Sequence, residues 1–397
     1  MFVFYLVIIV LLIILCFRLD FLLGEKNYQK KNQPAVYPTR HGQLDFLDTG
    51  KTFFDTLFND IRAAKTSIHI LFFIFRNDSL GSQLIDLLVE KADEGVEIKV
   101  LLDRVGAGLD KKGKQRLRDA NVSFAYAKSP SFPYLFFTFN QRNHRKITVV
   151  DGKIGYLGGF NVGDEYLGRD PKLGLWRDFH LRFEGEGVQD LQTQFLRDWE
   201  EAGNLPTSAD SYFPSLEEGT QPFHFISTEG EGLEALFFEH INKAQTYIYI
   251  ASPYFIPSSS LQRALCDAAK RGVEICIILP EKKDHPFVKE ASFKYIEELL
   301  KHDVKVFHFQ QGFFHAKALL IDDTFCDVGT ANFDRRSFDI NSEMNTIISD
   351  SSVITLVKQR LETDMKQSTL VSDRALQKRS FSVKIREKLA RIVEPLL

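Results

Sequence analysis

The fold of this chain is decided by a pair of matching stretches, "LFNDIRAAKTSIHILFFIF" at residues 57–75 and "LFFEHINKAQTYIYIASPYF" at residues 236–255. In each, apolar residues at helical spacing give way to a run rich in β-branched and aromatic residues. This change predicts an amphipathic helix followed by a buried strand. Each half then continues through a second helical pattern to the shared string "GVEI", at Gly95–Ile98 and Gly272–Ile275. Helices and strands that alternate in two copies predict an α/β fold built from an internal repeat.

The two copies are separated by residues 201–223, a segment rich in Pro, Ser, Gly and Asn. Such a composition is typical of a linker. We therefore expect a first domain at residues 51–200 and a second at residues 224–370, each a mixed β-sheet flanked by helices. Within both, the glycine of "GVEI" is expected to end a helix before the next strand.

Residues 371–397 form a C-terminal segment that mixes Lys and Arg with apolar residues, namely Val383, Ile385, Leu389, Ile392 and Val393. This pattern predicts an amphipathic helix. It fits a helix that lies on an acidic membrane surface, and equally a terminal helix docked on its own domain.

The first 24 residues predict a membrane anchor. Met1–Phe17 has no charged or strongly polar side chain, and apolar character resumes after Arg18 and Asp20. One helix of this length can cross a bilayer, whereas a cleaved signal peptide would need a basic start and a small-residue cleavage site. Basic residues follow in the expected juxtamembrane segment, residues 25–50, so we expect a single-pass protein of the cell membrane with its domains in the cytoplasm.

The composition narrows the function classes. The formal net charge is -3 at pH 7, whereas a dedicated nucleic-acid binder usually carries a basic surplus. The four cysteines show neither metal-ligand spacing nor a disulfide framework, which favours a reducing compartment. The 36 Phe residues supply apolar material for a core and suit a protein that meets lipid. The sequence thus favours a membrane partner and no nucleic acid.

The chemistry is predicted by a repeated motif, a His and a Lys two residues apart with an Asp five residues after the Lys. The two copies are His144, Lys146 and Asp151, and His315, Lys317 and Asp322. One copy arises by chance at roughly one position in ten thousand and would be weak evidence. Two copies inside a structural repeat, each followed by Gly and Asn at the same offsets, are strong evidence for one composite site.

The spacing of the motif has a physical reason. On a strand, His and Lys two residues apart point to the same face, so both can reach one bound phosphate. A two-fold arrangement of the halves would gather two imidazoles and two ammonium groups around one phosphodiester. Lysines and backbone donors then supply the positive field, so we expect neither a metal nor another cofactor. One imidazole would form a phospho-histidine intermediate while the other protonates the leaving alcohol.

An acid follows the motif in each half, Asp178 in "WRDFH" and Glu343 in "NSEMN". We expect these carboxylates to orient an imidazole and stabilise its charged form, and the alternative is a surface or strand-end carboxylate. Asp151 and Asp322 are interpreted as turn and strand-end residues that hold the site, because a turn-forming residue follows each.

Asn161 and Asn332 follow small residues in the two halves, and each either donates to a phosphate oxygen or caps a loop. The other histidines lack the partner pattern and are interpreted as structural or solvent-facing, including His69, His180, His240, His302 and His308. The aromatic runs before the two motif histidines, residues 132–139 and 307–314, fit either a lipid entrance or ordinary core packing.

Five strings carry a resemblance to a known family: "FFIFRND" (72–78), "NQRNHRKI" (140–147), "GGFNVGDEY" (158–166), "SPYFIPS" (252–258) and "GTANFDRRSF" (329–338). With the repeated motif they resemble the phospholipase D superfamily and, within it, the bacterial cardiolipin synthases, over most of the chain after the anchor. Many of these synthases carry two amino-terminal membrane segments, whereas this sequence shows one.

The resemblance implies two tandem phospholipase D-like domains related by a pseudo-two-fold axis, with one site between them. It implies His144 as nucleophile and His315 as general acid and base. The implied reaction transfers a phosphatidyl group from one phosphatidylglycerol to a second, giving cardiolipin and glycerol.

Three other functions are possible for a chain with these motifs. A hydrolase would pass the same intermediate to water and release phosphatidic acid, and the sequence leaves that choice open because water exclusion depends on pocket shape. A nuclease is disfavoured by the anchor and the charge. A non-catalytic scaffold is disfavoured because both motifs are complete.

Overall fold

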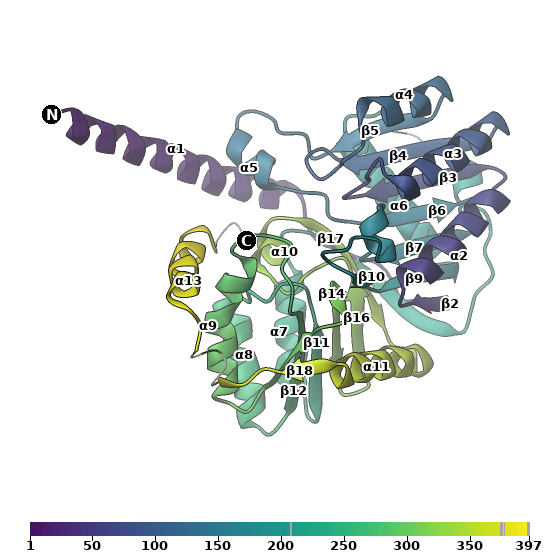
Figure 1. The fold of residues 1–397 in the computed structure, drawn as a ribbon. Coiled ribbons are helices and arrows are strands. Elements are labelled where there is room, and N and C mark those ends of the chain that lie inside the picture. Colours follow the sequence, from purple (N-terminus) through teal and green to yellow (C-terminus); the bar gives the residue numbers. More distant parts are fainter. Residues whose placement is uncertain (207–208, 374–375, 377, 395–397) are drawn as a thin grey trace.

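The computed structural model describes residues 1–206, 209–373, 376 and 378–394, and its two halves share one topology (Figure 1). In the first half the strands stand in the order β5 (Ser123–Ala127), β4 (Glu97–Asp103), β3 (Ser67–Phe72), β6 (Ile147–Val150), β7 (Ile154–Gly158), β9 (His180–Gly185) and β2 (Arg40–Leu47). In the second half the corresponding order is β13 (Lys305–Phe309), β12 (Glu274–Pro280), β11 (Tyr247–Ala251), β15 (Ala318–Ile321), β16 (Phe325–Gly329), β17 (Ser342–Ile348) and β10 (Gln221–Glu229). The first three strands of each series are parallel and the rest antiparallel. The same order in both halves is the pseudo-two-fold relation that the repeat predicts.

The two series join into one continuous sheet, because β2 and β10 pair antiparallel in the middle. Two short strands extend it, β1 (Ala35–Val36) beside β10 and β18 (Ser368–Leu370) beside β13. We expected one sheet in each domain, whereas the structure links them edge to edge. The link covers two sheet edges whose backbone groups would otherwise lack partners. Strand pairing between distant segments leaves no local signal, so the sequence patterns did not reveal it.

The pairing of β2 with β10 also bears on the segment boundaries that we expected from the sequence. β2 falls inside residues 25–50, which we expected to lie between anchor and domain, so that segment contributes a central strand to the folded core. The expected linker, residues 201–223, overlaps the connection between a helix that ends at Glu201 and β10, whose first three residues are already paired in the sheet.

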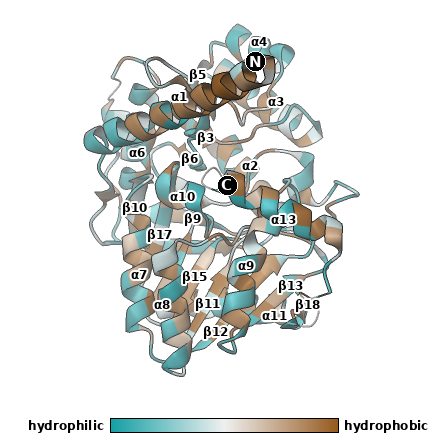
Figure 2. Cartoon of the chain, turned by 90° about the vertical axis from the view of Figure 1, so that its left-hand side faces the viewer, coloured by the Kyte–Doolittle hydropathy of each residue, from teal (hydrophilic) through white to brown (hydrophobic). Residues whose placement is uncertain are grey.

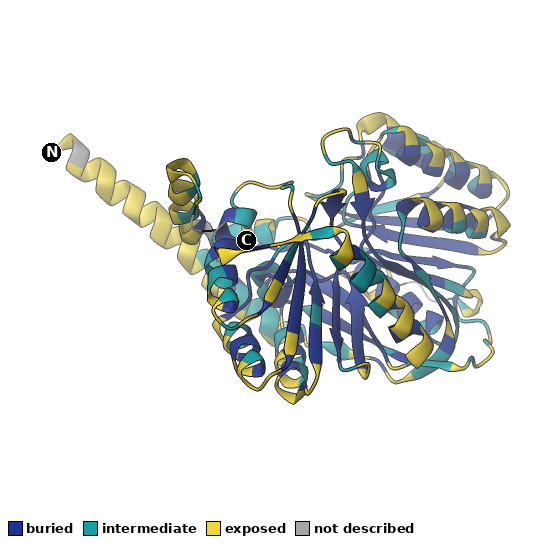
Figure 3. Ribbon diagram, turned by 60° about the horizontal axis from the view of Figure 1, so that its bottom comes forward, coloured by how far each residue is buried: buried dark blue, intermediate teal, exposed yellow. Residues whose placement is uncertain are grey.

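Helices cover both faces of the sheet (Figures 1 and 3). The helices of the first half are α2 (Gly50–Ala63), α3 (Ser79–Asp93), α4 (Lys111–Asp119), α5 (Leu135–Asn140) and α6 (Val188–Glu201), of which the short α5 lies away from the sheet. In the second half they are α7 (Leu233–Lys243), α8 (Ser259–Lys270), α9 (Val288–Leu300), α10 (Arg335–Asp339) and α11 (Ser351–Lys366), and α13 (Phe381–Val393) follows them. Successive strand residues such as Ile70 and Leu71 on β3 enter different cores because they point to opposite faces. The core that receives Leu71 also holds Phe195 of α6 and Leu361 of α11, so it ties the two halves together.

The glycines of the two "GVEI" strings end helices as predicted. Gly95 follows α3 with φ +89°, and Gly272 follows α8 with φ +90°. Both sites are open, so a side chain would meet no neighbour there. Glycine is favoured because of the positive φ and not because of space.

The amino-terminal helix, α1 (Phe2–Lys31), projects from the folded domains (Figure 1). Among the described residues, one helical stretch, Phe4–Lys30, is long and apolar enough to cross a membrane. Its inner end is fixed to α5, since the Phe137 N–H donates to Asp20 at 2.9 Å and the Phe17 and Phe136 rings lie 4.9 Å apart. The Tyr28 hydroxyl also donates to Glu229 at 2.5 Å, so the helix is anchored to both domains.

Candidate active site

Backbone contacts between the two halves position each motif histidine. The His144 N–H donates to the Ser342 carbonyl at 2.9 Å, and the His315 N–H donates to the Arg177 carbonyl at 2.7 Å. Beside His315, β14 (Gly312–Phe314) pairs in parallel with β8 (Leu175–Arg177), so the segment before each histidine runs next to the segment before the other half's acid.

As a result, each imidazole is hydrogen-bonded to a carboxylate from the other half. His144 Nδ1 lies 2.9 and 3.0 Å from the two carboxylate oxygens of Glu343. His315 Nδ1 lies 2.5 Å from Asp178 Oδ2. The sequence predicted an orienting acid in each half, but it did not reveal that the pairs cross between domains. All four groups are buried.

The motif lysines lie against the backbone of their own histidines. Lys146 Nζ donates to the His144 carbonyl at 2.6 Å, and Lys317 Nζ donates to the His315 carbonyl. Lys317 Nζ also lies 3.5 Å from Asp178 Oδ2 and within 2.5 Å of His315 Nδ1. Both ammonium groups are therefore at the site, and the second one is closer to an imidazole.

Burial sets the protonation of these groups. It lowers the pKa of His144, and together with the Lys317 charge it lowers the pKa of His315 to about 4. It also lowers the pKa of Lys146 to about 7. Burial would raise the pKa of Glu343, but the adjacent His144 imidazole and Lys146 outweigh it and hold that pKa at about 2. Since the carboxylate accepts, the neutral imidazole must donate from Nδ1, which leaves the Nε2 lone pair available.

Both imidazoles line one cavity of about 770 Å³. This volume lies within the range of about 300–1,000 Å³ that is typical of small-molecule sites. The Phe73 ring contacts His144 with centroids 5.0 Å apart, and the Trp176 ring contacts His315 at 4.9 Å. Arg142 and Arg336 lie in the wall, so the cavity offers cations as well as imidazoles to an anionic group.

Asn161 and Asn332 also line the cavity. The Asn161 side-chain oxygen accepts from the Ile74 N–H at 3.0 Å, and the Asn332 amide donates to Asp334 at 3.1 Å. Each asparagine therefore supports a loop of the wall. Contact with a phosphate oxygen stays a prediction for both.

Asp151 and Asp322 lie at the far end of the motif strands, where each starts a three-residue hairpin loop with φ +53°. Asp151 accepts from the backbone N–H groups of Lys65, Thr66 and Ser67. Asp322 accepts in the same way from Gln245, Thr246 and Tyr247. Seven residues along a strand span about 23 Å, so neither carboxylate reaches the imidazoles. Both hold the end of the hairpin against the strand that precedes it.

Five histidines outside the motif that we named from the sequence are structural or solvent-facing, as expected. His69 stacks on Phe195 and contacts Gln192, and burial lowers its pKa to about 4. His180 is buried against Phe53 with ring centroids 4.0 Å apart. The other three contact a phenylalanine ring or a surface glutamate, namely His240, His302 and His308.

Sequence reasoning missed several residues at this site. Thr330 donates to Glu343 at 2.6 Å and Ser337 donates to it at 2.9 Å. Both lie in "GTANFDRRSF", as does Arg336, and Arg142 lies in "NQRNHRKI". These strings signalled the family but carried no spacing from which a role follows.

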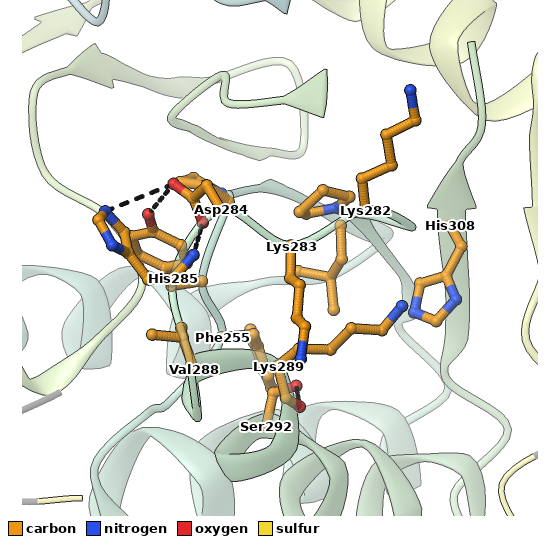
Figure 4. A pocket seen from close by; sticks show the side chains of 13 residues that line it. Phe255, Lys282, Lys283, Asp284, His285, Val288, Lys289, Ser292 and His308 are labelled. Atoms are coloured by element: carbon orange, nitrogen blue, oxygen red, sulfur yellow. Dashed lines mark hydrogen bonds and ion pairs between the residues drawn. The ribbon is translucent and has the colours of Figure 1, made fainter. Parts of the chain in front are cut away.

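A loop at residues 282–289 borders the cavity and is shown from close by in Figure 4. Tyr254 donates to Asp284 at 2.5 Å, and His285 lies 3.7 Å from the same carboxylate. Lys282, Lys283 and Lys289 come from this loop and from the start of α9 (Figure 4). The loop therefore brings a group of positive charges to the rim.

The two aromatic runs differ in exposure. In residues 132–139, Phe132 is 84% and Phe139 53% exposed, so this run remains available as a lipid entrance. In residues 307–314, Phe309, Phe313 and Phe314 are fully buried. The lipid-entrance interpretation is wrong for these three, because they support the paired strands before His315 from the core.

Comparison with known proteins identifies the family of the chain. The family model described as "Cardiolipin synthase, PLD-like domain" matches residues 57–199 and 237–365. The chain belongs to this family of the phospholipase D superfamily. It is 40% identical over 395 residues to the minor cardiolipin synthase ClsB of Bacillus subtilis strain 168, with 98% of this chain and 99% of that relative covered. It is also 40% identical over 373 residues to a cardiolipin synthase of Oceanobacillus iheyensis, which covers 92% of this chain and 78% of that relative.

Solved structures show the same fold. The phosphatidylserine synthase of Haemophilus influenzae Rd KW20 superposes with a TM-score of 0.73 at 16% identity, over 94% of this chain and 100% of that one. The polyphosphate kinase of Porphyromonas gingivalis superposes with a TM-score of 0.58 at 11% identity, over 89% of this chain and 54% of that one. At these identities the likeness concerns the fold alone.

Proposed function

We propose that this chain is a cardiolipin synthase, a phosphatidyltransferase that joins two phosphatidylglycerol molecules into cardiolipin and releases glycerol. The observation that carries the proposal is the pair of motif histidines, one from each half, that line one cavity and are each held by a carboxylate from the opposite half. Relatives named cardiolipin synthase match over nearly the whole chain and support the lipid substrate.

In the first step, the Nε2 lone pair of His144 attacks the phosphorus of one phosphatidylglycerol. The bond from phosphorus to the headgroup glycerol oxygen breaks. His315 gives that oxygen the Nε2 proton that it takes up from solution when the anionic phosphodiester binds, so glycerol leaves. Lys146, Lys317 and backbone donors balance the charge of the phosphoryl oxygens. The phosphatidyl group is then bonded to His144.

In the second step, the headgroup hydroxyl of another phosphatidylglycerol enters. His315 Nε2 accepts the hydroxyl proton while the oxygen attacks phosphorus, and the bond from phosphorus to His144 breaks. The product is cardiolipin, and both imidazoles return to their starting state. Glu343 and Asp178 keep each imidazole in the tautomer that these transfers require.

The test is turnover of phosphatidylglycerol by purified full-length protein in proteoliposomes, with lipids and glycerol quantified by mass spectrometry. We expect cardiolipin and glycerol in equal amounts, and neither with His144→Ala or His315→Ala. Phosphatidic acid in place of cardiolipin would identify a hydrolase, because water would then have taken the phosphatidyl group. Conversion that persists in either variant would overturn the assignment of the two histidines.

The chain is a membrane protein by its amino-terminal helix and its relatives. We propose the cell membrane as its location, with the catalytic domains in the cytoplasm, because Arg18, Lys26, Lys30 and Lys31 follow the apolar stretch. Protease treatment of inverted membrane vesicles should digest the carboxyl-terminal domain, and a protected domain would reverse this orientation.

A further inference from the structure

Helix α13 docks on the second domain largely through ion pairs and hydrogen bonds. Arg386 Nε lies 3.0 Å from Glu290 Oε1, and Glu394, just after the helix, lies 2.6 Å from Lys294 Nζ. Tyr295 also donates to Glu394 at 2.5 Å. Ion pairs and hydrogen bonds to α9 thus hold α13 in place, and Ala390 is the fully buried residue of its inner face.

Besides Ala390, Val383 faces the second domain and packs against its core, whereas the other apolar residues of α13 whose side chains the structure describes point the other way. Four of them are exposed, by 79%, 44%, 48% and 76%, namely Phe381, Ile385, Leu389 and Ile392. Their spacing of four, four and three residues places them in one stripe, on the side of the helix opposite Ala390. The side chain of Val393 lies outside the described residues. If α13 docked in order to bury its apolar residues, this stripe would face the domain. Since the stripe faces away from the domain, we expect another apolar environment to cover it.

The stripe lies on the side of the molecule from which α1 projects (Figures 1 and 2). Both helices are largely exposed there, and α13 runs across the direction of α1 (Figures 1 and 3). The exposed aromatic run is on this side too, because α5 packs against α1. Three exposed apolar surfaces of distant sequence origin therefore share one face, and one of them is the membrane-crossing helix.

The charge on this face is positive. Helical geometry places Lys384, Lys388 and Arg391 along one flank of the stripe. A groove of about 500 Å³ separates α13 from the loop at residues 282–289. Two acids line it, Glu281 and Glu290, but its cations outnumber them, namely Lys172, Lys282, Lys283, Lys289 and Arg386. Lys283 also lines the catalytic cavity, so the groove and the site share a wall. Basic side chains beside an apolar stripe fit an anionic lipid surface.

We infer that α13 is a second membrane contact, which lies flat in the interfacial layer of an anionic bilayer with Phe381, Ile385, Leu389 and Ile392 inserted. It holds the second domain against the leaflet at which α1 and α5 hold the first. The catalytic cavity then opens toward that leaflet between two membrane-bound elements. The contact itself does not depend on the proposed reaction.

The test measures the depth of one α13 residue in the full-length protein. Ile385→Cys is compared with Leu356→Cys on α11, a position of similar exposure (50%) on a helix away from this face. Both carry Cys16→Ser, since the other three cysteines are buried. Each cysteine is labelled with an environment-sensitive fluorophore, and the protein is placed in phosphatidylcholine vesicles with or without phosphatidylglycerol.

We expect brominated lipid to quench the label at 385 and aqueous iodide to quench it several-fold less than the label at 356. Phosphatidylglycerol should strengthen both differences. Equal iodide quenching at the two positions would overturn the inference. So would a label at 385 that is shielded from iodide but not quenched by brominated lipid, because protein would then cover the stripe. No turnover is needed, so either result leaves the proposed function to its own test.

Discussion

The two halves of the active site are built from matching elements, but the hydrogen-bond partners of their carboxylates differ. Glu343 accepts from the Thr330 and Ser337 hydroxyls as well as from His144. Asp178 accepts from the Phe179 N–H at 2.8 Å and lies between His315 and the Lys317 ammonium. Neutral hydroxyl donors fix Glu343, and Glu343 in turn fixes the His144 imidazole. At Asp178, by contrast, an imidazole, an ammonium and a carboxylate share protons. The first suits a nucleophile, and the second suits a group that gives and regains a proton.

The largest effect that this comparison predicts separates the two histidines. Both His144→Ala and His315→Ala should lower phosphatidylglycerol turnover at least about 10⁴-fold, as loss of a nucleophile or its partner does elsewhere. With a phosphatidyl ester of p-nitrophenol, whose leaving group needs no proton, His315→Ala should still release p-nitrophenol in a burst and retain the phosphatidyl group. His144→Ala should show no burst. A burst from His144→Ala alone would exchange the two roles.

The next effect compares the orienting carboxylates. Removal of an orienting carboxylate in a comparable triad costs about 10⁴-fold in kcat, so Glu343→Gln and Asp178→Asn should each cost about 10²- to 10⁴-fold. Of the two carboxylates, only Asp178 lies within ion-pair distance of a motif ammonium, at 3.5 Å from Lys317 Nζ. Asp178→Asn therefore breaks a buried ion pair, which typically costs about 3–5 kcal/mol of folding free energy. Thermal unfolding should therefore show the larger loss for Asp178→Asn. Equal stability of the two variants would mean that Lys317 does not depend on Asp178.

The third prediction concerns the number of protons that the protein takes up when a phosphodiester binds. Burial and the Lys317 charge lower the pKa of His315 to about 4, so its imidazole is neutral in the empty site above that pH. A phosphodiester anion in the cavity favours the charged imidazole and raises this pKa, so binding should take up a proton from neutral solution. Calorimetry of a soluble diester, repeated in buffers of different ionisation enthalpy, measures the uptake. It should approach one proton in the parent protein and fall in Asp178→Asn, whereas release of a proton would contradict the sign.

The sequence predicted the parts of this molecule whose signals are local or repeated. Helix-to-strand changes, the glycines after α3 and α8, and the duplicated motif each depend on residues close together in the chain. The features that the sequence did not predict depend on contacts between distant segments. They are the pairing of β2 with β10 and the hydrogen bonds between the halves, from His144 to Glu343 and from His315 to Asp178. A periodic pattern states which face of a strand is buried, but it contains no information about the strand beside it.

The smallest effect is expected where the halves are most alike, at Asp151 and Asp322. Asparagine tolerates their positive φ but accepts the backbone N–H groups without a full charge, so Asp151→Asn and Asp322→Asn should each lower stability by about 1–3 kcal/mol. In a chain of this size the melting temperature should fall by about 2–4 °C per kcal/mol. Because both carboxylates lie far from the imidazoles, the kcat of the folded fraction should stay within about twofold of the parent value. Loss of one net hydrogen bond in the transition state would lower kcat by more than that. A loss of kcat as large as that of Glu343→Gln, at unchanged melting temperature, would place these aspartates in the reaction itself.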